Sequence, residues 1–71
     1  MTKQVTPAAI RRWGKKHDHL LTPAQVGIVA RAQMSLEVGM RNKVAMRASP
    51  AMRKAVSADL QAFADLAGRI K

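Results

Sequence analysis

The C-terminal part of the chain repeats apolar and polar positions at helical spacing. Its apolar residues follow one another at intervals of four, four, three, four and three, at Met52, Val56, Leu60, Phe63, Ala67 and Ile70. Residues at such intervals lie on one face of an α-helix. The pattern therefore predicts an amphipathic helix over about 50–70.

Three short phrases mark the places where helices begin. The chain reads Thr-Pro-Ala at 6–8 and again at 22–24, and Ser-Pro-Ala at 49–51. A hydroxyl at such a position accepts a hydrogen bond from a free N–H of the first turn, and proline fits the first helical position because it has no N–H to leave unpaired. Gln25 gives Thr22 the spacing of a capping box. These signals predict three helix starts.

The two helices nearer the N-terminus differ in their apolar surface. The helix over about 7–17 has one apolar side, whereas the helix over about 23–38 is apolar almost all round. The second pattern is typical of a helix at the centre of a domain. We expect 50–70 to pack on this central helix and 7–17 to lie across both. Gly14 costs about 1 kcal/mol relative to Ala, which predicts a weak last turn in the first helix.

The segment between the second and third helices has a mixed pattern. Apolar residues alternate with polar or small ones from Met34 to Ala48, which is typical of a strand. Its Met, Leu, Glu, Lys and Arg residues nevertheless favour a helix, and β-branched residues are few. A helix broken near Gly39 and a basic β-hairpin both stay open. The predicted fold is mainly α, with three helices (about 7–17, 23–38 and 50–70) and a basic segment 39–49 that forms an exposed arm or a short β-hairpin.

The net charge of the chain indicates a class of function. The 71 residues contain 13 Lys and Arg against 4 Asp and Glu, a net charge of +9. A chain of this length makes one domain, so 1–71 is predicted to be a single small basic domain. The whole excess lies within 1–54, because the cations beyond it are balanced by Asp59 and Asp65. Such an excess is typical of proteins that bind nucleic acid.

Catalytic and metal-binding patterns are absent from the sequence. There is no cysteine and no glycine-rich phosphate loop, and the carboxylates are spread along the chain, at Asp18, Glu37, Asp59 and Asp65. His17 and His19 stand two apart without a third ligand nearby. We therefore expect no enzymatic activity, no metal and no cofactor.

The same composition bears on the compartment. Lack of cysteine fits a reducing interior, and the most apolar run contains Arg31 and is too short to span a bilayer. The amphipathic helix 50–70 is the neutral part of the chain, which disfavours a membrane-active peptide. The sequence predicts a cytoplasmic protein with no membrane partner.

Residues 5–16, VTPAAIRRWGKK, resemble the recognition helix of helix-turn-helix transcription regulators. In that family a phrase such as Val-Thr-Pro-x-x-Ile-Arg-Arg-Trp opens the helix that enters the major groove. The resemblance implies a phosphate contact for Thr6, contacts in the DNA groove for Arg11 and Arg12, and core packing for Ile10 and Trp13. The family has a supporting helix before this one, and here the helix at 23–38 is expected to brace it from the other side.

Further cations extend this candidate surface. Arg11 with Lys15, and Arg12 with Lys16, stand four apart and form two basic ridges on one helix. A second cluster over 41–54 holds five cations and no acid, and two of these cations lie in a first helical turn, where the helix dipole disfavours them. The predicted nucleic-acid-binding residues are Thr6, Arg11, Arg12, Lys15, Lys16, Arg41, Lys43, Arg47, Arg53 and Lys54.

Two functions stay open. The first is a small basic transcription regulator that binds nucleic acid, DNA rather than RNA, through phosphate contacts that salt weakens steeply. In the second, the size and charge of the chain look like those of small phage-encoded proteins that bind host RNA polymerase and inhibit or modify transcription by protein contact. A homodimer is compatible with so small a core, although no heptad seam supports one.

Overall fold

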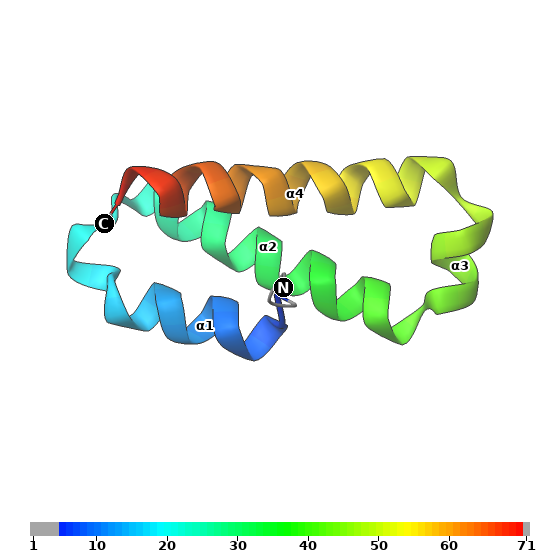
Figure 1. Ribbon diagram of the computed structural model, residues 1–71, viewed down its shortest axis with the longest axis horizontal. Helices are drawn as coiled ribbons and strands as arrows, with labels where there is room; N and C mark the ends of the chain where they lie inside the picture. Colours follow the sequence, from blue (N-terminus) through cyan, green and yellow to red (C-terminus); the bar gives the residue numbers. More distant parts are fainter. Residues whose placement is uncertain (1–4, 71) are drawn as a thin grey trace.

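The computed structural model describes residues 5–70, and within them the secondary structure is entirely helical (Figure 1). The elements are α1 (Pro7–Lys16), a 3-10 turn η1 (Asp18–Leu20), α2 (Pro23–Arg41), α3 (Lys43–Ala48) and α4 (Pro50–Arg69). The prediction of a mainly α fold is confirmed. Three of these helices correspond to the predicted ones, and α3 is an additional short helix.

The residues before the three prolines cap the helices as predicted. Thr6 Oγ1 accepts a hydrogen bond from the backbone N–H of Ala9 at 3.1 Å, and Ser49 caps α4 in the same way. Thr22 and Gln25 form the complete capping box, because each side chain accepts from the backbone N–H of the other, at 3.3 and 2.9 Å. The three helix starts are therefore confirmed to the residue.

Of the two alternatives left open for the segment 39–49, the β-hairpin is wrong and the broken helix is observed. Helix α2 continues through Gly39 to Arg41 and stops at Asn42, whose side-chain amide donates to the carbonyl of Val38 at 3.1 Å. The backbone N–H of Asn42 donates to the same carbonyl, at 3.0 Å, and the non-helical backbone of Asn42 (φ −120°, ψ 57°) separates α2 from α3, which begins directly afterwards. The helical preference of the Met, Lys and Arg residues outweighs the alternating pattern, and the break lies three residues beyond Gly39.

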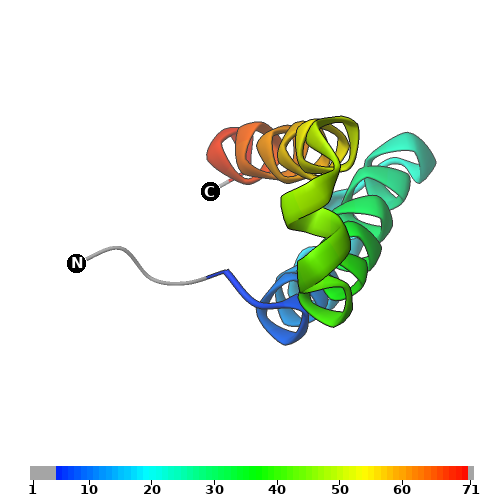
Figure 2. The ribbon, with the colours of Figure 1, turned by 90° about the vertical axis from the view of Figure 1, so that its right-hand side faces the viewer.

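Helix α2 occupies the centre of the molecule, where it packs against α4 and α1, while α3 joins its C-terminal end to the start of α4 (Figures 1 and 2). The described chain is flat, with extents of 38 × 28 × 17 Å. The core is small and consists of Ile10, Val29, Ala32 and Leu66, with Trp13, Leu21, Ile28, Leu36, Leu60, Phe63 and Ile70 partly buried around it.

Gly14 sets the distance between α1 and α2. A Cβ atom at this position would lie 2.8 Å from Cγ1 of Val29, closer than side chains approach in proteins. The glycine therefore allows the two helices to pack closely, and α1 continues past it to Lys16. The same residue that lowers helix propensity thus permits the tertiary contact.

One side of α2 stays exposed, although the helix is apolar almost all round and lies at the centre of the molecule. Figure 2 shows α1 and α4 on the same side of α2, so that its outer side faces away from both. Apolar side chains on α2 are accordingly exposed, among them Met34 at 63% and Val38 at 44%. The pattern identified the central helix correctly, but none of the described helices covers its outer side.

Candidate nucleic-acid interface

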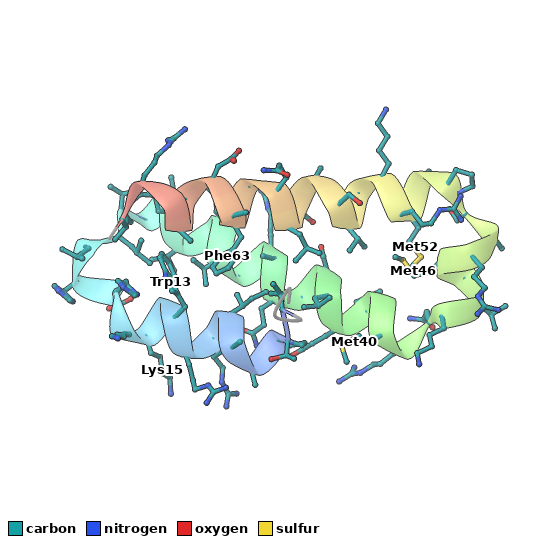
Figure 3. All side chains as sticks on the ribbon, viewed as in Figure 1. Trp13, Lys15, Met40, Met46, Met52 and Phe63 are labelled. Carbon is teal, nitrogen blue, oxygen red and sulfur yellow. The ribbon has the colours of Figure 1, made fainter. Side chains whose placement is uncertain are left out.

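Helix α1 presents four cations to solvent. Ile10 is fully buried, and it shares the inner side of the helix with Trp13. The outer side of α1 carries four exposed cations, Arg11, Arg12, Lys15 and Lys16. Figure 3 shows Lys15 pointing away from the bundle. Arg11 and Lys15 both line a hollow between α1 and α2, with Lys15 extending outward from its edge, and Arg12 and Lys16 are not among the residues that line this hollow.

Neighbouring hollows connect cations from three helices. The hollow between α1 and α2 is lined by Arg11 and Lys15. The next one shares Arg11 and adds Arg41 from the end of α2. A third shares Arg41 and continues to Lys43 at the start of α3. We call this surface the basic groove, and the predicted residues along it are Lys15, Arg11, Thr6, Arg41 and Lys43.

Thr6 has a double role at the edge of the basic groove. Its hydroxyl oxygen caps α1 by accepting from Ala9, and it lines the same hollow as Arg11 and Arg41. A hydroxyl that accepts through its oxygen still has its proton to donate. Thr6 can therefore donate to an anion while it holds the first turn of α1.

Polar residues that were not predicted from the sequence also line the basic groove. Gln33 borders the first two hollows, and its amide donates a long hydrogen bond of 3.4 Å to Glu37, which borders the second. Asp18 borders the first hollow. The basic groove thus combines four cations with two carboxylates. The spacing of Gln33, Glu37 and Arg41 at four-residue steps placed them on one side of a helix and was a usable signal.

The other three cations of the second predicted cluster, Arg47, Arg53 and Lys54, lie on α3 and α4 and have different roles. Arg47 and Lys54 are exposed. Nη1 of Arg53 donates instead to the carbonyl oxygens of Met46 at 2.8 Å and Arg47 at 2.6 Å. These carbonyls belong to the C-terminal end of α3, where the helix dipole favours a cation.

This arrangement explains a cation in the first turn of α4 without any ligand. The Arg53 guanidinium bonds to carbonyl groups at the C-terminal end of α3. This favourable contact offsets the repulsion between the cation and the N-terminal dipole of its own helix, α4. The structure therefore brings together half of the ten predicted residues in the basic groove, and leaves Arg12, Lys16, Arg47 and Lys54 as exposed cations outside it.

Trp13 is partly buried and packs against the core. Its ring meets Phe63 of α4 edge-on, with centroids 5.3 Å apart, and stacks on His17 at 4.3 Å. Nδ1 of His17 lies 2.8 Å from the Trp13 carbonyl oxygen. Because a carbonyl only accepts, Nδ1 carries a proton. The tryptophan thus links α1 to α4 and fixes the face of α1 that turns outward.

Within residues 5–70 no three histidine, cysteine or acidic side chains gather in a way that could hold a metal ion. None of the helices described has the length and apolarity needed to cross a bilayer. Comparison with protein-family models, with curated proteins and with solved structures found no match for this chain. The candidate interface is thus defined by the residues and hollows above.

Proposed function

We propose that this chain is a small transcription regulator that binds nucleic acid, duplex DNA rather than RNA, through the basic groove. One observation carries the proposal. Lys15, Arg11, Arg41 and Lys43 come from three helices, and they follow one another along connected hollows. Cations in a line can neutralise successive phosphates of a nucleic-acid backbone, and each contact releases condensed counterions.

The exposed side of α1 is the part that would enter the major groove. An α-helix with its side chains is about 10–12 Å across, which fits the major groove width of about 12 Å, and the 10 residues of α1 extend for about 15 Å. Arg11 and Arg12 would meet base edges, as the resemblance to a recognition helix implies. Thr6 and Arg41 would contact phosphates near the N-terminal end of α1, and the lysines near its C-terminal end would contact phosphates on the other side.

The experiment is a titration of a fluorescein-labelled mixed-sequence duplex, followed by anisotropy at several salt concentrations. If about four phosphates are neutralised, affinity falls about 100-fold between about 50 and 200 mM salt. A single strand and an RNA duplex of the same sequence are the comparisons, and both are expected to bind more weakly. Affinity that does not change with salt contradicts phosphate binding.

A second candidate is a regulator that binds RNA polymerase by protein contact. The exposed apolar side chains of α2, Met34 and Val38 above all, favour it, because exposed apolar surface is typical of protein interfaces. Pull-down of purified RNA polymerase at low and high salt tests this function. Apolar contact survives at high salt, whereas contact through charges alone is screened. Loss of capture at both salt concentrations counts against it.

A further inference from the structure

A largely apolar groove runs between α2 and α4, on the side of α2 away from the basic groove. Its lining residues are Arg31, Met34, Ser35, Val38, Met52, Ala55 and Val56. Only Arg31 and Ser35 among them are polar, and the Ser35 hydroxyl already donates to the carboxylate of Asp59 on α4. We call this surface the α2–α4 groove. Met34 and Met52 are among its walls, and their flexible side chains can adapt to the shape of a partner.

The exposed face of α2 beside the α2–α4 groove has an ordered charge pattern. Arg31, Met34, Val38 and Arg41 follow at steps of three, four and three, so they lie on one side of the helix, and all four are exposed. Arg31, Met34 and Val38 line the α2–α4 groove, whereas Arg41 lies beyond its end and also lines the basic groove, so it borders both surfaces. Two apolar side chains are thus flanked by one cation at each end. A ligand that complements this face carries two apolar side chains with a carboxylate beyond each of them.

A second copy of this chain does not complement the face. In an antiparallel pair of α2 helices centred between Met34 and Val38, Arg31 of one copy would face Arg41 of the other. In a parallel pair, each arginine would face its own equivalent. Each copy also has a net charge of +9. Like charges at both ends of the contact oppose association in either orientation.

We propose that the α2–α4 groove binds an acidic amphipathic helix of a partner protein, with two apolar side chains four residues apart entering between Met34, Val38 and Met52, and with carboxylates facing Arg31 and Arg41. This is the mode in which a helix lays its apolar face in a groove. The inference deepens the second candidate function and rests on its premise of a protein partner. It names the surface and the chemistry of that partner.

The probe is a designed alanine-based helical peptide with two leucines four residues apart and a glutamate three residues outside each leucine. A matched peptide has lysine in place of both glutamates. Binding to the full chain is followed through the methionine methyl signals in NMR. Met34 and Met52 line the α2–α4 groove, whereas Met40 lines the hollows on the other side and is the internal reference. The glutamate peptide is expected to shift the signals of Met34 and Met52 and to leave Met40 unchanged.

Two substitutions test the two parts of the contact. Met34→Gln removes an exposed apolar anchor and is expected to weaken binding of the glutamate peptide about tenfold. Met40→Gln is the matched control, because this methionine is 54% exposed on the same helix, and it is expected to leave binding unchanged. Arg31→Gln is expected to weaken binding of the glutamate peptide about two- to fivefold and to bring it closer to that of the lysine peptide.

Three results overturn the proposal. One is equal binding of the two peptides, a second is a shift of Met40 without a shift of Met34 and Met52, and the third is concentration-dependent self-association that Met34→Gln abolishes, which makes a second copy the occupant. The outcome is separable from that of the polymerase pull-down. Peptide binding without polymerase capture refutes only that choice of partner, and polymerase capture that Met34→Gln does not affect refutes only this surface.

Discussion

The guanidinium of Arg53 donates a hydrogen bond of 2.6 Å to the backbone carbonyl of Arg47, and the same nitrogen reaches the carbonyl of Met46. One cation of α4 thus closes the C-terminal end of α3. Since α3 has only six residues, it depends on contacts of this kind more than on its own propensity. This contact gives Arg53 a structural role that differs from that of its neighbour Lys54, although the sequence predicted both as phosphate-binding residues.

Replacement of Arg53 is therefore expected to destabilise the fold. Arg53→Gln should lower the free energy of unfolding by about 1 kcal/mol, because charged hydrogen bonds at an exposed helix end are lost. Lys54→Gln is the matched control and should change it by less than about 0.5 kcal/mol. Urea denaturation followed by circular dichroism measures both. Equal effects of the two substitutions would mean that the Arg53 contact contributes nothing to stability.

Gly14 gives a second stability prediction, in which propensity and packing have opposite signs. Alanine at an exposed glycine in a helix stabilises by up to about 1 kcal/mol, and Gly27→Ala should do so because nothing lies within 4 Å of its added methyl. Gly14→Ala should instead destabilise, since its methyl would meet Val29 at 2.8 Å. Thermal unfolding of the two variants compares them directly.

A double variant checks the cause of the Gly14 effect. Val29→Ala removes the methyl groups that Gly14→Ala would contact, so the two changes together should cost less than the sum of the single changes. If Gly14→Ala stabilises as much as Gly27→Ala does, the close packing of α1 on α2 is refuted.

The contact between Trp13 and Phe63 is expected to couple α1 to α4. An edge-on aromatic pair contributes about 0.5–1.5 kcal/mol beyond the area it buries. A double-mutant cycle with Trp13→Leu and Phe63→Leu should give a coupling free energy in this range. Additive effects would show that Trp13 does not depend on Phe63, and they would leave its ring available for other contacts.

Much of the fold could be predicted because its signals are local. The Thr-Pro and Ser-Pro pairs predicted where the helices begin, because a capping hydroxyl and the N–H that it binds are only three residues apart. The apolar stripe of 50–70 gave α4 for the same reason. The sequence predicted the helix break near Gly39, whereas it lies at Asn42. The Asn42 side chain bonds to the carbonyl four residues earlier, and a sequence does not show which of its possible hydrogen bonds an asparagine forms.

The candidate site was harder to predict, because its signals depend on distant residues. The ridges of α1 could be read from spacing alone, but nothing local indicates that Arg41 and Lys43 continue the line that Arg11 begins. The role of Arg53 depends on the path of the chain between α3 and α4. The exposure of Met34 could not be read from the pattern either, because an apolar helix surface is the same in a sequence whether or not another element covers it.

The basic groove is tested most directly by the salt dependence of duplex DNA binding in a variant that removes two of its cations. For Lys15→Gln combined with Arg41→Gln, the slope of log affinity against log salt should become shallower by about 2, one for each lost phosphate contact. Arg69→Gln, at the far end of α4, removes an exposed cation outside the basic groove and should leave the slope unchanged. A slope that is the same in the double variant, in Arg69→Gln and in the unmodified protein would contradict nucleic-acid binding through the basic groove.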